Sequence, residues 1–364
     1  MSPTRLALDP ARVGSEIAEF SRRMARVAEQ LATIDAGAEG CSPRTEVLRQ
    51  DKTVLWRYER MAPDAGLPPL VICYALVNRP YMLDLQPDRS LIRGLLARGL
   101  DVYLVDWGYP DRSDSGLSLD DYVNRYLGAC LDHVRRAHGG APVSLLGVCQ
   151  GGTLSICHAA LHPERVRNLV TMVTPVDFHT DENLLSKWVR KLDVERMVEK
   201  LGNVPGALLN AAFIALMPLR LTAGKYAGLA DIAEDRAALE NFLRMERWIH
   251  DSPDQAGTAF REFVRDFFQD NRLVKGGLMI GGRAVDLGAI ACPVLNIFAS
   301  KDHLVPPSAS QPLARLTGSR DYTPFEFDGG HIGIYVSRSA QELLPRTIAQ
   351  WLQKHRGSSV TIEP

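Results

Sequence analysis

Short runs of aliphatic and β-branched residues alternate with helical patterns over most of the chain. The apolar runs are "LVICYAL" near Val71, "DVYLVDWG" near Val102, "VSLLG" near Val143, "NLVTMVT" near Val170, "PVLNIFAS" around Asn296 and "TPFEF" ending at Phe327. Helical patterns fall between them, for example at residues 90–98 and 121–138. Strands that are apolar on both faces are typical of a mostly parallel sheet covered by helices on both sides. We therefore predict a doubly wound α/β fold.

The run "TVLWRYER" at residues 53–60 has a different pattern, because polar and apolar residues alternate in it. Alternation of this kind indicates a strand with one solvated face. We expect an antiparallel strand at the edge of the sheet.

An amphipathic helix is predicted in the N-terminal segment, residues 1–38. Apolar residues recur there at steps of three and four: Val13, Ile17, Phe20, Met24, Val27 and Leu31. Such a stripe is the signature of a helix with one apolar face. Two interpretations stay open: the face packs on the protein's own body, or it docks onto another chain or an apolar surface.

The alternation of strands and helices stops between residues 177 and 287. This interval contains helical patterns such as "NFLRMERWIH" and "AGTAFREFVRDFFQD". An insertion of this size between two strands is most simply a largely helical cap over the carboxyl ends of the strands. We expect residues 39–176 and 288–358 to form the core and residues 177–287 to form the cap.

Composition and charge exclude several function classes. The 364 residues carry a formal net charge of −1 and lack a long basic run, so the chain has no electrostatic footprint for nucleic acid. It shows neither a signal peptide nor an apolar run long enough to span a bilayer. The six cysteines include no C-x-x-C pair, which predicts neither a zinc site nor a disulfide framework. A cytoplasmic protein with free thiols, without metal or cofactor, is expected.

The stretch "SLLGVCQGGTLS" contains the first candidate for chemistry, Cys149. It reads G-x-C-x-G from Gly147 to Gly151, between a predicted strand and a predicted helix, as in a nucleophile elbow. Small flanking residues are needed because the turn is sharp. The start of the helix points at the sulfur and favours the thiolate. A buried structural cysteine between glycines remains the alternative.

Two further residues follow later strands in the order of an α/β hydrolase. Asp302 follows "PVLNIFAS" in "SKDHLVPP", and His331 follows "PFEF" in "DGGHIGIY". Nucleophile, acid and histidine then occur in the chain order of that fold. His303 is an alternative imidazole and Asp328 an alternative acid, although both are less well placed. An α/β-hydrolase fold with a Cys149–His331–Asp302 triad is predicted.

Acyl transfer also requires donors for the oxyanion. The residue after the nucleophile, Gln150, is expected to supply one backbone N–H, and Val77 in the loop after an early strand the second. A cysteine nucleophile keeps the acyl group activated as a thioester, whereas a serine ester would lose that activation. The cysteine therefore favours acyl transfer from a thioester over simple hydrolysis.

At these residues the chain resembles the class III polyhydroxyalkanoate synthases. The similarity extends over core and cap, in "YALVNRPYMLDLQPDRS", "DVYLVDWGYPD", "LLGVCQGG", "VRNLVTMVTPVDF", "FLRMERWIHDSPDQAG", "CPVLNIFA", "DHLVPP" and "GGHIGIYVS". The resemblance implies that Cys149 is acylated, that His331 is the general base, and that Asp302 orients His331 or helps to activate the incoming hydroxyl group.

The resemblance also implies a substrate and partners. The substrate would be an (R)-3-hydroxyacyl coenzyme A, most simply 3-hydroxybutyryl-CoA, and the products a growing polyester and free coenzyme A. A second, non-homologous subunit, dimerisation through the cap and association with polyester granules are implied as well. The N-terminal stripe and the cap are the candidate contact surfaces.

Two rival functions fit the same residues. A thiol-dependent esterase, thioesterase or lactone hydrolase would release only soluble acid. A non-catalytic granule or scaffold protein would retain the fold with an inert Cys149. The cysteine and the similarity in the cap weigh against the first, and three intact catalytic positions weigh against the second.

Overall fold

A computed structural model describes residues 9–34, 39–216 and 228–357. The chain forms two compact units. One contains residues 1–38 and 210–250, and the other contains residues 39–209 and 251–364. The predicted ends of the N-terminal segment and of the core, at residues 1–8, 35–38 and 358, lie outside the described residues.

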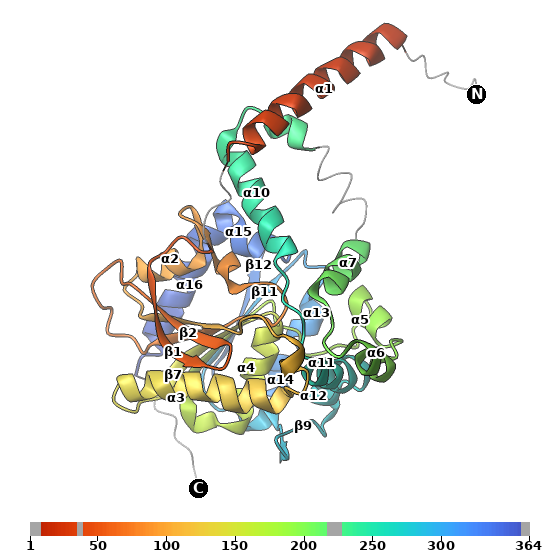
Figure 1. The fold of residues 1–364 in the computed structure, drawn as a ribbon. Coiled ribbons are helices and arrows are strands. Elements are labelled where there is room, and N and C mark those ends of the chain that lie inside the picture. Colours follow the sequence, from red (N-terminus) through yellow and green to blue (C-terminus); the bar gives the residue numbers. More distant parts are fainter. Residues whose placement is uncertain (1–8, 35–38, 217–227, 358–364) are drawn as a thin grey trace, which may run out of the picture. The chain divides into compact units, whose positions relative to one another are not determined.

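The larger unit is built on a mostly parallel sheet (Figure 1). Among the described residues this sheet has eight strands in the order β1-β2-β6-β3-β7-β8-β11-β12. Neighbours from β6 to β12 are parallel. The strands are β1 (Arg44–Gln50), β2 (Thr53–Tyr58), β3 (Leu70–Cys73), β6 (Val102–Asp106), β7 (Val143–Val148), β8 (Val166–Met172), β11 (Val294–Ala299) and β12 (Tyr322–Phe327). The apolar runs of the sequence thus correspond to the parallel strands, as predicted.

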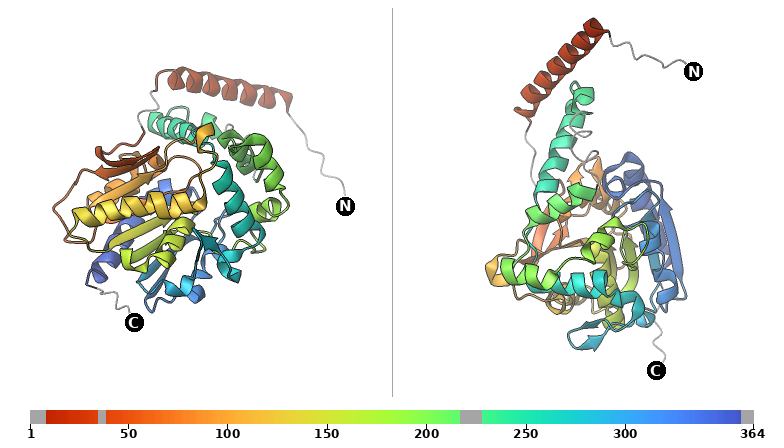
Figure 2. Two further views of the ribbon diagram at one scale, coloured as in Figure 1. Left: turned by 60° about the horizontal axis from the view of Figure 1, so that its bottom comes forward. Right: turned by 90° about the vertical axis from the view of Figure 1, so that its right-hand side faces the viewer.

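Helices cover both faces of this sheet, which explains why its central strands are apolar on both sides. On one face, α3 (Leu127–Ala137) and α4 (Gln150–Leu161) contribute to the core with Val71, Tyr103 and Leu145 of the sheet. On the other face, α2 (Leu91–Leu96) packs against α16 (Arg338–Lys354) (Figures 1 and 2). A π-helical turn at Asp121–Tyr126 precedes α3.

The expected edge position of residues 53–60 is wrong. Strand β2 is antiparallel, as predicted, but it lies between β6 and β1. The edge strand is β1, which pairs with β2 across the turn at Asp51 and Lys52. Polar positions in β2 do not mark an open edge, because part of β2 is half-buried or exposed even with a neighbouring strand on each side.

The smaller unit contains α1 (Pro10–Leu31), a 3-10 turn at Gly228–Ile232 and α10 (Arg236–His250). The expected amphipathic helix is therefore present. Its stripe is divided: Val27 is buried with Leu229 and Leu239, whereas Ile17 and Phe20 are 61% and 46% exposed.

The interval between β8 and β11 is largely helical, as expected. It contains α5 (Leu184–Val189), α6 (Val194–Leu201), α7 (Gly206–Leu216), α10, α11 (Gly257–Phe263), a π-helical turn (Val264–Gln269), α12 (Arg272–Lys275) and a short hairpin of β9 (Met279–Ile280) and β10 (Arg283–Ala284). The interval is divided between the two units. The domain limits derived from the sequence stay a prediction.

The turn from β7 into α4 has an unusual backbone. Cys149 caps α4 with φ 53° and ψ −125°. Few non-glycine residues adopt a positive φ, and such a conformation costs on the order of 1–3 kcal/mol. The Cys149 N–H donates to Met172 O at 2.9 Å, and Cys149 O accepts from Gly152 N at 2.9 Å. The surrounding structure thus holds the strained residue on both sides.

Glycines make this turn possible by close packing. A Cβ on Gly147 would meet Gly152 and Ser155, and a Cβ on Gly152 would meet Thr174. A Cβ on Gly151 would overlap the backbone of Cys73 and Tyr74, where β3 ends. The helix can therefore start this close to the sheet only without side chains at these positions.

We predict that Gly151→Ala destabilises the protein by about 1–3 kcal/mol, because the new methyl group meets backbone that cannot move away. Gly116→Ala is the matched control, since nothing lies within 4 Å of a Cβ there. Urea unfolding of both variants measures the difference. A Gly151→Ala variant as stable as the control would show that the turn is less tightly packed than described.

Candidate active site

Cys149 and Cys41 differ from the other four cysteines in exposure, since both are partly exposed. Cys149 lies at the start of α4, whereas Cys73, Cys130, Cys157 and Cys292 are buried. Burial raises the pKa of each of these four thiols to about 12, which keeps them neutral and unreactive. Cys157 is a core residue, as expected. All six thiols are free.

The structure brings Asp302 and His331 together. His331 Nδ1 donates to Asp302 Oδ2 at 2.6 Å, and both side chains are buried. Because Nδ1 is engaged by the carboxylate, Nε2 is the ring nitrogen left for another group. A carboxylate orients an imidazole in the same way in catalytic triads.

Backbone contacts place both residues at the carboxyl ends of neighbouring strands. The other oxygen of Asp302, Oδ1, accepts from the N–H groups of Leu304 and Val305, each at 2.9 Å. The loop after β11 is tied to the loop after β12, since Lys301 N donates to Gly329 O at 2.8 Å. The carboxylate and the imidazole therefore come from two loops that hold each other.

The alternative acid and the alternative imidazole occupy other places. Asp328 is exposed and pairs with Lys301 at 2.6 Å. The imidazole that contacts Asp302 is that of His331, so His303 does not take that position.

Electrostatics link His331 to Cys149. Burial by itself lowers the pKa of His331, but the negative charges of Asp302 and Cys149, together with the hydrogen bond to Asp302, raise it to about 10. The charge of Cys149, at the end of β7, thus acts on the imidazole that Asp302 holds at the ends of β11 and β12.

The segment before Val77 lies beside Gln150. The Gln150 side chain accepts from Leu76 N at 3.1 Å, and the Gln255 side chain donates to Leu76 O at 2.8 Å. The backbone N–H and C=O of Leu76 are therefore both hydrogen-bonded to glutamine side chains. Since the N–H of Val77 points opposite to the C=O of Leu76 in a trans peptide, Gln255 also sets the direction of that N–H.

Sequence reasoning missed three residues around this site. Gln255, 5% exposed, lies in a stretch without periodicity, so only the tertiary contact reveals it. Tyr74 lies directly after β3, and burial together with the charge of Cys149 raises its pKa. Tyr335 of the short helix Gly333–Val336 packs against His331, which lies in the turn before that helix.

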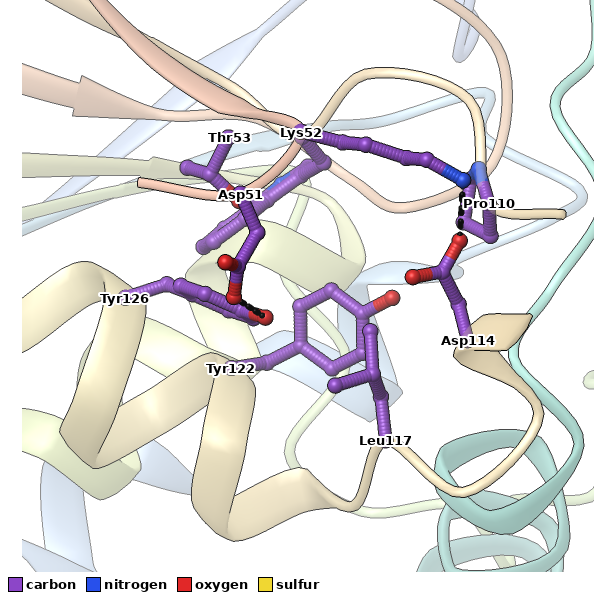
Figure 3. A pocket seen from close by; sticks show the side chains of 9 residues that line it. Asp51, Lys52, Thr53, Pro110, Asp114, Leu117, Tyr122 and Tyr126 are labelled. Atoms are coloured by element: carbon purple, nitrogen blue, oxygen red, sulfur yellow. Dashed lines mark hydrogen bonds and ion pairs between the residues drawn. The ribbon is translucent and has the colours of Figure 1, made fainter. Parts of the chain in front are cut away.

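A small surface pocket elsewhere in the larger unit contains none of the triad residues. It lies between the β1–β2 turn and the segment before α3, and its charged groups already have partners (Figure 3). Lys52 pairs with Asp114, and Tyr126 Oη donates to Asp51 at 2.8 Å.

Within the described ranges, no group of three or more His, Cys, Asp and Glu residues could hold a metal ion. No described helix combines the length and apolar character needed to cross a bilayer.

Solved structures with a similar backbone confirm the fold. A monoacylglycerol lipase from Paleococcus ferrophilus superposes with a TM-score of 0.53 over 83% of this chain and 99% of the lipase, at 18% identity. A haloalkane dehalogenase from Bradyrhizobium elkani gives 0.51 over 88% and 100%, at 17% identity. At such identities the likeness concerns the fold alone.

Sequence relatives are far closer. A family model described as "alpha/beta hydrolase fold" matches residues 68–337. The poly(3-hydroxyalkanoate) polymerase subunit PhaC of Allochromatium vinosum is 54% identical over 95% of this chain and 98% of its own length. That of Thiocystis violacea is 50% identical over 95% and 98%. The PhaC subunit of Cupriavidus necator is 26% identical over 84% of this chain and 55% of its own length.

Similarity at this level, over nearly the whole length of two relatives, includes both the strands and the interval between β8 and β11. The α/β-hydrolase fold and the resemblance inferred from the sequence are thereby confirmed. The chain belongs to the family of PhaC subunits of poly(3-hydroxyalkanoate) polymerases, and it is an acyltransferase of the α/β-hydrolase fold.

Proposed function

We propose that this chain polymerises (R)-3-hydroxyacyl-CoA, most simply 3-hydroxybutyryl-CoA, through an acyl group carried on Cys149. The observation that carries the proposal is the buried 2.6 Å hydrogen bond between Asp302 and His331. The charge of Cys149 also acts on the His331 imidazole. A partly exposed sulfur on a strained turn completes the arrangement.

Acylation begins when the Cys149 thiolate, formed by proton transfer to His331, attacks the thioester carbonyl of the substrate. The backbone N–H groups of Gln150 and Val77 donate to the oxyanion that forms. The carbon–sulfur bond to coenzyme A then breaks, and the leaving thiolate takes the proton from His331. The product is an acyl-Cys149 thioester and free coenzyme A.

Chain growth reuses the same groups. His331 takes the proton of an incoming hydroxyl group, whose oxygen attacks the acyl-Cys149 carbonyl. An ester bond forms, the sulfur leaves as the thiolate, and Asp302 stabilises the imidazolium. Because the acyl thioester remains activated, each transfer needs no further energy source. The proposal requires no metal or prosthetic group, since coenzyme A arrives as part of the substrate.

Partners follow from the family. The relatives are named as subunits, which supports a multi-subunit synthase. We include in the proposal a second, non-homologous subunit, a homodimer formed through the cap, and a place in the cytoplasm at the surface of polyester granules. The exposed Ile17 and Phe20 of α1 are the candidate contact residues.

We predict that Cys149→Ser lowers coenzyme A release from 3-hydroxybutyryl-CoA on the order of 10³-fold or more, because the nucleophile is lost. Cys41→Ser is the control. Burial and Asp84 raise the pKa of Cys41 to about 12, and its thiol donates to Asp84 at 3.1 Å, a bond that serine retains. Thiol titration measures release. Undiminished release by Cys149→Ser contradicts the proposal, and soluble acid without polymer from wild type identifies a thioesterase instead.

We predict unequal effects of Asp302→Asn on the two half-reactions. Chain growth should slow about 10-fold more than first acylation, because the hydroxyl group is harder to deprotonate than the thiol. Rapid-quench measurement of acyl-Cys149 formation and of polymer length separates the steps. Equal losses would assign Asp302 a purely orienting role.

The raised pKa of His331 predicts a pH dependence of stability. A histidine whose pKa rises from 6.5 to about 10 on folding stabilises the protein fully below pH 6.5 and loses this contribution as the pH rises through 10. The stability difference between wild type and Asp302→Asn should therefore be larger at pH 6.5 than at pH 10. Urea unfolding at both pH values measures it, and NMR of labelled histidine should show His331 titrating lower in the variant. A difference that does not depend on pH would contradict the assigned ion pair.

A further inference from the structure

Tyr335 lies against the catalytic imidazole but has no role in the mechanism above. It belongs to α15 (Gly333–Val336), the short helix that follows His331. Its ring meets that of His331 edge to face, with centroids 5.9 Å apart and an interplanar angle of 83°. The side chain is 1% exposed. The tyrosine is thus buried in a packed position beside His331.

The hydroxyl group of Tyr335 is buried and makes no hydrogen bond to any described residue. Buried hydroxyl groups in folded proteins nearly always have a partner, because an unsatisfied one is costly. A phenylalanine would fill the same space without this cost. A hydroxyl group kept at this place therefore points to a partner that comes from outside the chain.

The contact with His331 places this tyrosine at the proposed reaction site. Burial and the charges of Tyr74, Cys149 and Asp302 raise the pKa of Tyr335 well above its usual value. The phenol thus lies within electrostatic range of both the sulfur and the carboxylate of the triad. It stays protonated at neutral pH, so it can donate as well as accept a hydrogen bond.

The proposed substrate has one polar group near the reacting carbon that lacks a partner. The thioester carbonyl is bound by the N–H groups of Gln150 and Val77, and the leaving sulfur receives its proton from His331. The 3-hydroxyl group, two carbons from the carbonyl, has none of these partners. A neutral tyrosine hydroxyl group matches it, since each can donate to the other.

We propose that the Tyr335 hydroxyl group binds the 3-hydroxyl group of the acyl chain on Cys149 and so selects 3-hydroxyacyl over plain acyl thioesters. This inference rests on the proposed acylation of Cys149 but does not require polymerisation. It makes Tyr335 a residue that determines specificity.

The test compares wild type and Tyr335→Phe with two substrates, (R)-3-hydroxybutyryl-CoA and butyryl-CoA, which lacks the hydroxyl group. The measured quantity is the rate of coenzyme A release in a single turnover, with acylation of Cys149 verified by mass spectrometry. We expect the variant to lose about 10- to 100-fold with the hydroxylated substrate. With butyryl-CoA it should change less than about twofold, because no hydrogen bond is lost there.

Two patterns of rates overturn the inference. Equal losses with both substrates would show that Tyr335 acts on His331 or on the oxyanion, and unchanged rates with both would show a packing role. Wild type that does not acylate Cys149 with either substrate overturns the proposed function itself. Acylation that yields only soluble acid rejects polymerisation yet leaves the Tyr335 comparison valid.

Two controls separate this effect from damage to the fold. Tyr335→Phe removes a hydroxyl group without a partner among the described residues, so its melting temperature should equal or exceed that of wild type. Tyr126→Phe removes a hydroxyl group that donates to Asp51 at 2.8 Å, outside the site. This second variant should process both substrates like wild type.

Discussion

The proposed chemistry of this molecule depends on one strained residue at the start of a helix. Cys149 has a positive φ, a conformation that a side chain disfavours. Two backbone hydrogen bonds and the contact of Gly151 with the end of β3 hold it there. Contacts with the sheet and within the turn therefore both hold the strained residue in place. As a result the sulfur remains partly exposed while the sheet beneath it is buried.

The same rigidity extends to the groups that act on the sulfur. Asp302 is held by two backbone N–H groups through one oxygen and by His331 through the other. Its position leaves the imidazole little freedom to turn. Gln150 and Gln255 hold Leu76 from both ends, and with it the Val77 N–H. Preorganised donors of this kind need no rearrangement during the reaction. A site built in this way suits a reaction repeated many times on one sulfur.

In the proposed mechanism, the residues that transfer the proton differ from the residue that recognises the substrate hydroxyl group. The ionisable groups Cys149, His331 and Asp302 interact with one another and move the proton. Tyr335 stays neutral, and its ring packs edge to face against that of His331. Its hydroxyl group has no hydrogen-bond partner among the described residues. Recognition of a substrate hydroxyl group would therefore not disturb the charge balance of the triad. The fold is shared with a lipase and a haloalkane dehalogenase, whereas Tyr335 is proposed to set the substrate preference of this chain.

By itself the sequence determined the parallel strands, the strand–turn–helix at Cys149 and the chain order of the three triad residues. These features are local, because they depend on apolar runs, on glycine spacing and on the ends of strands. The place of β2 inside the sheet, by contrast, depended on which strand pairs beyond it, and the alternation of its residues carries no information about that neighbour.

The sequence favoured Asp302 over Asp328 as the partner of His331, and the tertiary structure showed the contact itself, since Asp328 pairs with Lys301 instead. The tertiary structure also revealed the contacts of Gln255 and Tyr335, which join segments with no common sequence pattern. Hydrogen bonds between distant segments depend on how loops pack, and no periodicity in the chain records that packing.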